Sequence, residues 1–164
     1  MQAITRPRAD EGLDALAGAF EQHWEEMIHF ITSRRFKSSV YRGAAGELSQ
    51  VQLGALMILA RQDLRMSDLA ARLGLPESTT TRLVDRLEGA RLVKREASFP
   101  DRRCVVAGLT AQGRRLIQRV RQDRQEFLKA ILETLPRGER TELVRLFGRM
   151  AEELRARDLV GAGS

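Results

Sequence analysis

The sequence predicts a mainly helical protein with one small β-hairpin, a fold of the α+β class. Only four of the 164 residues are proline, and leucine, alanine and arginine are abundant, which favours helix. Apolar residues recur at steps of three and four in the N-terminal, middle and C-terminal segments. Residues 93–98 and 104–109 instead predict two strands, because they flank a turn at Phe99–Pro100–Asp101 and the second strand alternates at Val105, Ala107 and Leu109.

We expect a single domain over residues 1–164, since this length and 43% hydrophobic content suffice for one core. The formal net charge is +6, and it is concentrated in one region. Residues 77–124 hold 12 Lys/Arg and 6 Asp/Glu, whereas the rest of the chain holds 16 of each. Such an excess is typical of a surface that binds nucleic acid, because neutralised phosphates release counterions. A solvated basic face without a partner is the alternative.

The predicted location is the cytoplasm, without a membrane partner. The single cysteine, Cys104, cannot form an internal disulfide. The N-terminal residues lack the apolar segment of a signal peptide. The longest apolar run, residues 53–60, is far shorter than the roughly 20 residues that span a bilayer.

Long helices are predicted at both ends of the chain. Residues 10–36 form the first, with Asp10 as its N-cap. Thr110 caps another long helix, Pro136 ends it, and a last helix follows to about Arg157. Each helix has one narrow apolar stripe and therefore needs a partner helix. The stripes consist of Leu13, Ala17, Phe20, Trp24, Met27, Ile28 and Ile31, then Leu116, Val120, Phe127, Leu128, Ile131 and Leu135, then Leu143, Leu146, Phe147, Met150 and Leu154.

Shorter elements are predicted in the middle of the chain. Residues 37–47 are expected to form a loop, and Ser49 with Gln52 forms a capping box that starts a helix with Leu53, Leu56, Met57 and Ala60 buried. Residues 64–66 are expected to pair as a small strand with the hairpin. Ser67 is the expected N-cap of the next helix, with Leu69, Ala70 and Leu73 inward, and Gly74 ends it.

The following helix, which begins at Pro76, has the features of a DNA-reading helix. If Leu83, Val84 and Leu87 face inward together with Thr80, a polar face points outward. Short hydroxyl side chains near the start of that face allow bases and phosphates to approach closely. A helix, a turn, this helix and then a charged hairpin predict major-groove insertion with a neighbouring minor-groove contact. The outward residues are Ser78, Thr79, Thr81, Arg82, Asp85 and Arg86.

Six ordered segments resemble the MarR family of winged helix-turn-helix transcription regulators. They are LSQVQLGALMILA, SDLAARLGL, STTTRLVDRLE, LVKRE, DRR and LTAQGRRL, which together cover about residues 48–120. The resemblance implies a DNA-binding lobe over residues 48–110 and dimerisation helices over residues 10–36 and 111–158. It also implies a homodimer on a pseudo-palindromic operator, with reading helices about 34 Å apart. The implied function is that of a regulator, more commonly a repressor, which a small molecule such as a phenolic or other aromatic compound releases from double-stranded DNA.

The resemblance also implies roles for individual residues. Arg82 would contact a base and Arg86 a phosphate. Arg103 would enter the minor groove, Asp101 would hold it by an ion pair, and Arg102 would meet the DNA backbone. An ordinary surface salt bridge between Asp101 and Arg103 is the alternative. The residues expected in the major groove are Ser78, Thr79, Thr81 and Arg82.

Two positions depart from the family pattern. The family often has glycine, suited to a left-handed helix end, where this chain has Arg91. We expect Gly89 to take over the helix end two residues earlier. Pro76 stands where the family commonly has a serine N-cap, which removes one hydroxyl that could bind phosphate.

The remaining reactive or aromatic residues have simpler interpretations beside their functional ones. Cys104 is a candidate redox thiol, because Arg102 and Arg103 could lower its pKa, but a small strand residue is the favoured interpretation. Trp24 is expected to pack in a helix interface, or else to line an effector pocket with Met27 and His29.

We predict no metal site and no cofactor, because His23 and His29 share no helix face well and no HExxH motif occurs. An enzyme is not expected either, since no catalytic triad order or phosphate-binding glycine loop is present. A weakly specific or architectural DNA-binding protein and a regulator that responds to oxidation through Cys104 remain the alternatives to a regulator released by an effector.

Overall fold

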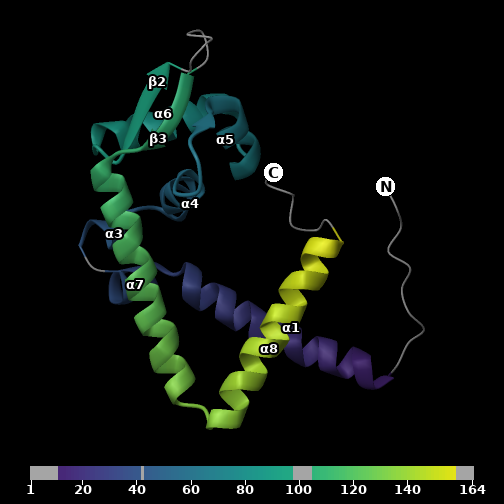
Figure 1. Ribbon diagram of the computed structural model, residues 1–164. Coiled ribbons are helices and arrows are strands. Elements are labelled where there is room, and N and C mark those ends of the chain that lie inside the picture. Colours follow the sequence, from purple (N-terminus) through teal and green to yellow (C-terminus); the bar gives the residue numbers. More distant parts are fainter. Residues whose placement is uncertain (1–10, 42, 98–104, 158–164) are drawn as a thin grey trace.

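The computed structural model describes residues 11–41, 43–97 and 105–157 (Figure 1). It is mainly helical with a small antiparallel sheet, as predicted. In chain order the elements are α1 (Glu11–Thr32), α2 (Arg34–Val40), α3 (Ala44–Glu47), α4 (Gln50–Leu59), β1 (Leu64–Arg65), α5 (Met66–Leu73), α6 (Glu77–Gly89), β2 (Val93–Ala97), β3 (Val105–Leu109), α7 (Ala111–Glu133) and α8 (Arg137–Ala156).

The sheet has the strand order β1-β3-β2, so the hairpin strand β3 lies in the centre. Leu64 of β1 and Arg95 of β2 both pair with Ala107 of β3. This confirms the prediction that residues 64–66 contribute a small strand beside the hairpin. Gly108 lies close to the Asp63 side chain, so that a Cβ there would be 2.5 Å from Asp63 Oδ1 and the carboxylate would have to move.

The hydrophobic core lies in the lobe formed by α4, α5, α6, the sheet and the first half of α7. Its largest fully buried side chains include Leu56, Leu69, Leu87 and Leu109, one from each of four elements. Of the inward residues predicted for α6, Thr80, Val84 and Leu87 are fully buried, whereas Leu83 is only partly buried and packs against the edge of the core. The chain ends contribute little to this core, because α8 contains no buried residue.

Outside the lobe, the second half of α7 extends away from the sheet, α8 turns back from its far end, and α1 also lies outside the lobe (Figure 1). Their apolar stripes are exposed within a single chain. Large apolar residues on them with at least a third of their surface exposed are Leu13, Leu16, Phe20, Trp24, Met27, Phe30, Leu128, Ile131, Val144, Leu146, Phe147, Met150 and Leu154. Within the part of the chain that the structure describes, none of these helices is both long and apolar enough to span a bilayer.

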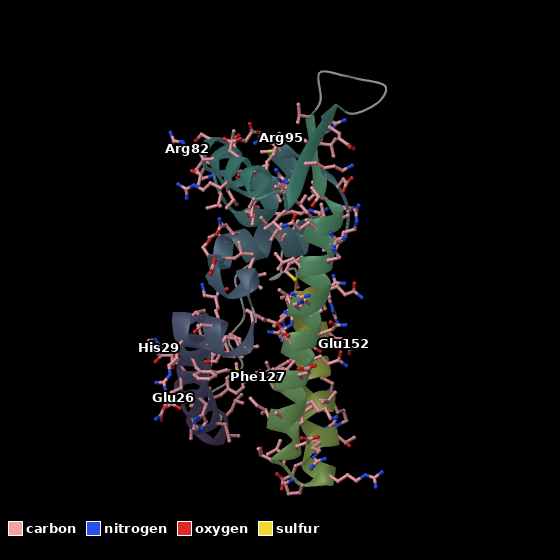
Figure 2. All side chains as sticks on the ribbon, turned by 90° about the vertical axis from the view of Figure 1, so that its left-hand side faces the viewer. Glu26, His29, Arg82, Arg95, Phe127 and Glu152 are labelled. Carbon is pink, nitrogen blue, oxygen red and sulfur yellow. The ribbon has the colours of Figure 1, made fainter. Side chains whose placement is uncertain are left out.

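An aromatic cluster joins α1 and α2 to α7. Phe36 is its centre, with ring centroids 5.2 Å from Phe30, 5.0 Å from Phe127 and 6.3 Å from Tyr41. The Phe127 ring lies between α7 and the α1–α2 segment (Figure 2). Edge-to-face contacts of this kind stabilise the junction beyond the area they bury.

The N-terminal prediction of one helix over residues 10–36 followed by a loop was wrong. The helix stops at Thr32, because the Ser33 hydroxyl accepts a hydrogen bond from Phe36 N (3.0 Å) and caps a new helix. Local bonds of this type compete with helix continuation. Most of the expected loop is helical, since α2 reaches Val40 and α3 occupies residues 44–47.

Two smaller predictions also need correction. Ser67 does not cap α5, which begins one residue earlier at Met66 with Arg65 in the N-cap position. Val105 does not face inward, because 41% of its surface is exposed at the outer end of β3. The Ser49–Gln52 capping box, the helix end at Gly74 and the Thr110 cap are confirmed.

Candidate nucleic-acid interface

The helices α5 and α6 form a helix-turn-helix. Gly74 ends α5 with φ +64°, in the left-handed region where glycine is free of strain. Pro76 then precedes α6, where its missing N–H costs no intrahelical bond. The buried Thr80 hydroxyl donates to Pro76 O (3.2 Å), so a polar group is accommodated in the core side of α6.

The opposite side of α6 is a polar, exposed surface. Arg82 lies at the end of the molecule that also carries β2 and β3, and Arg95 lies between α6 and the strands (Figure 2). Side chains of the reading helix and the hairpin can therefore contact the same face of a ligand. The predicted major-groove residues and the predicted phosphate contact are all exposed: Ser78, Thr79, Thr81, Arg82 and Arg86.

Arg95 of β2 links the hairpin to α6, and sequence reasoning missed it. Its Nη1 donates to Asp85 Oδ1 (2.6 Å) and Glu88 Oε2 (2.8 Å), and its Nη2 donates to Thr81 O (3.2 Å). The sequence signal was the spacing of Thr81, Asp85 and Glu88, which places them in one row along a helix. Which cation of the hairpin meets that row depends on strand register, which the sequence did not supply.

The helix α6 ends in an unusual way at Arg91. This residue adopts φ +58°, and Leu92 N donates to Leu87 O (2.9 Å) in the pattern of a Schellman motif. The expectation that Gly89 would take over the left-handed helix end was wrong, because Gly89 is the last helical residue and the positive φ falls on Arg91. The buried Leu92 decides the outcome: the turn at Arg91 brings it into the core.

The base of the hairpin is fixed to α7. Thr110 Oγ1 donates to Arg91 O (2.6 Å) and accepts from Gly113 N (3.0 Å), so one hydroxyl joins the end of α6 to the start of α7. A Cβ on Gly113 would lie 2.1 Å from Leu92 O. Only glycine lets the two backbones approach this closely, and the contact sets the direction in which α7 leaves the lobe.

This arrangement was compared with known proteins. The model of the MarR family matches residues 47–103, from the end of α3 to the far side of the hairpin turn. Over this segment, about a third of the chain, the protein is similar to the MarR family. The Bacillus subtilis protein YfiV, described as an uncharacterized HTH-type transcriptional regulator, is 38% identical over 90 residues, covering 54% of this chain and 56% of YfiV.

Several solved structures share the fold over most of the chain. RV1404 from Mycobacterium tuberculosis is 28% identical, with a TM-score of 0.70 over 88% of this chain and 95% of RV1404. Streptococcus pneumoniae FabT, solved in complex with DNA, has a TM-score of 0.71 at 15% identity, covering 85% of this chain and 98% of FabT. The three curated relatives are described as uncharacterized HTH-type transcriptional regulators, and the chain spans about half to two thirds of their length.

The other predicted site residues lie on α1 or outside the described part of the chain. Trp24, Met27 and His29 are exposed on α1, and Trp24 stacks on Phe20 with ring centroids 6.1 Å apart. His29 points away from Phe127 and α7 (Figure 2). Among the described residues, no group of three or more His, Cys, Asp or Glu could hold a metal ion. The predicted hairpin residues Asp101, Arg102, Arg103 and Cys104 lie outside the described residues.

Proposed function

We propose that this protein is a sequence-specific DNA-binding transcription regulator that acts in the cytoplasm. The observation that carries the proposal is the exposed polar face of α6 beside the hairpin. In this proposal Arg82 contacts a base edge and Arg86 a phosphate. Beyond the hairpin turn, Arg103 enters the minor groove, held by Asp101, and Arg102 meets the backbone. The hydroxyl side chains of Ser78, Thr79 and Thr81 line the major groove beside Arg82.

We also propose that two copies bind one pseudo-palindromic site. The support is the large apolar side chains that α1, the second half of α7 and α8 expose, since large exposed apolar patches on a soluble domain mark interaction sites. Between α1 and α8, Phe20, Leu146, Phe147 and Met150 line an open hollow of about 540 Å³ that a partner helix can fill. Pairing through these helices places two copies of α6 about one DNA turn, roughly 34 Å, apart.

The proposed regulator is a repressor that a phenolic or other aromatic compound releases. Trp24 and Met27 support a pocket on α1, because they expose apolar surface on a helix that also belongs to the proposed dimer interface. His29 adds a polar group on the same helix. A compound bound there changes the separation of the two reading helices. Thermal-shift screening against phenolics, antibiotics and urate-like compounds tests this, because a ligand that binds the folded state raises the unfolding temperature.

Selection of binding sites from a random duplex library tests the main proposal. The protein is expected to enrich one pseudo-palindromic sequence and to form a discrete gel-shift complex with it in excess nonspecific DNA. Absence of such a complex at moderate salt refutes the proposal. A small ratio of specific to nonspecific affinity instead supports the architectural alternative.

Two arginine variants separate reading from backbone contact. Arg82→Ala is expected to weaken binding and to relax the base preference at one position. Arg103→Ala is expected to weaken binding with a smaller dependence on salt. Lys129→Met serves as the control, because it removes one exposed positive charge on α7, far from α6. Equal effects of all three variants contradict the assigned roles.

The redox alternative has its own test. Peroxide treatment is expected to change the DNA affinity of the wild-type protein and of the Cys104→Ser variant to the same small extent. A peroxide response that disappears with this substitution identifies a thiol switch instead.

A further inference from the structure

The net charge of α6 is negative, although we propose that this helix binds DNA, which is itself negatively charged. Over Glu77–Gly89 it has three acidic residues, Glu77, Asp85 and Glu88, against two arginines, Arg82 and Arg86. The positive excess of residues 77–124 therefore comes from the hairpin and α7 and not from the helix itself. Carboxylates that approach phosphates without a counter-charge oppose binding.

Asp85 is the critical carboxylate because it belongs to two rows of α6. Ser78, Arg82 and Asp85 are spaced by four and three residues and therefore lie in one row along the helix. This is the outward row that we propose enters the major groove. Asp85 also stands between Thr81 and Glu88 in the row that faces β2. Its side chain is 54% exposed, so it is accessible from the side on which we place the DNA.

Arg95 forms hydrogen bonds with all three residues of the row that faces β2. A single guanidinium reaches Asp85 at 2.6 Å, Glu88 at 2.8 Å and Thr81 O at 3.2 Å, and its side chain is only 23% exposed. The contacts extend over two turns of α6, from residue 81 to residue 88. A planar, multiply donating group is needed for this, and a lysine ammonium cannot make the same three contacts.

We propose that Arg95 is a positioning residue for DNA binding: it fixes the rotation of α6 relative to the hairpin and withdraws the charge of Asp85 and Glu88 from the DNA. The proposal rests on the proposed DNA-binding function. Arg95 acts through the two carboxylates and makes no phosphate contact of its own. The Thr81 carbonyl bond matters in the same way, because it holds the turn of α6 that carries Thr81 and Arg82.

A double-mutant cycle on the duplex selected by the wild-type protein tests this inference. Arg95→Met is expected to weaken binding about tenfold, a value typical of a lost charge-assisted contact that is partly exposed. The substitutions Asp85→Asn and Glu88→Gln, made together in the Arg95→Met protein, are expected to restore most of the lost DNA affinity. In the wild-type background the same pair is expected to change affinity by less than about twofold, since Arg95 already neutralises both groups.

Additive effects overturn the inference, because a direct phosphate contact by Arg95 predicts the same gain from Asp85→Asn and Glu88→Gln in both backgrounds. Unchanged affinity of Arg95→Met also overturns it. Arg95→Lys provides a second cycle if the methionine variant does not fold, with a smaller loss of about threefold expected because one contact remains possible. Lys129→Met controls for net charge. Failure of the proposed function is distinguishable, because the wild-type protein then selects no duplex at all.

Discussion

Replacing Arg91 by glycine is expected to stabilise the protein. The left-handed conformation of Arg91, φ +58°, costs a residue with a Cβ about 1–2 kcal/mol. Glycine removes this cost but gains conformational freedom in the unfolded chain, which offsets about 0.4–1 kcal/mol. The middle values of the two ranges leave a net gain of about 0.8 kcal/mol, which raises the unfolding temperature by roughly 2–3 °C for a chain of this size. The Thr110 hydrogen bond to Arg91 O is retained, because its acceptor is the backbone.

Thermal unfolding by circular dichroism at one fixed protein concentration measures this effect. Arg91→Ala is the matched control, because it removes the charged side chain and keeps the Cβ that causes the strain. We expect the alanine variant to unfold at or slightly below the wild-type temperature. If Arg91→Ala stabilises the protein as much as Arg91→Gly does, the side-chain charge and not the backbone conformation is responsible, and the reasoning fails.

Three further predictions follow from single contacts. Gly113→Ala is expected to destabilise the protein by about 2 kcal/mol or more in urea unfolding, because the new Cβ would lie 2.1 Å from the backbone atom Leu92 O. An unchanged urea midpoint of unfolding contradicts this expectation. Leu56→Ala, at a fully buried position, is expected to lower the free energy of unfolding by about 2–5 kcal/mol in the same assay. A loss below about 1 kcal/mol, the value of one methylene group, contradicts this and shows that neighbouring side chains fill the cavity. The side-chain hydrogen bond from Arg145 holds the pKa of Glu142 below its ordinary value. The small stabilisation by this pair is therefore present above the ordinary carboxyl pKa and is lost as the pH falls through the lowered pKa of Glu142. Arg145→Met is expected to raise the pKa of Glu142, which an NMR titration measures.

Local chemistry made much of the lobe predictable. The capping box at Ser49 and Gln52 and the left-handed end at Gly74 involve residues at most a few positions apart. The two faces of α6 followed from helical periodicity alone, which correctly assigned Thr80 to the core. The family resemblance came from the same segment, and the family match over residues 47–103 confirmed it.

Predictions failed where a local preference competed with another bond. The single helix expected over residues 10–36 is interrupted at Ser33, because the Ser33 hydroxyl accepts a hydrogen bond from Phe36 N and so caps a second helix. Gly89 was the intrinsically better residue for a helix end, yet Arg91 adopts the left-handed conformation. Burial of Leu92 outweighs the backbone strain at Arg91, and propensity contains no information about that burial.

The sequence by itself determined the class of fold, the resemblance to a family and the exposed face of α6, because helical and strand periodicities are properties of neighbouring residues. Only the tertiary structure decided that Arg95 meets Thr81, Asp85 and Glu88, and that Gly113 lies against the Leu92 carbonyl. These contacts join different elements, from seven residues apart for Arg95 and Glu88 to 21 residues apart for Gly113 and Leu92. Their partners are chosen by strand register and helix packing, which minimise the free energy of the whole core and are not encoded at any one position.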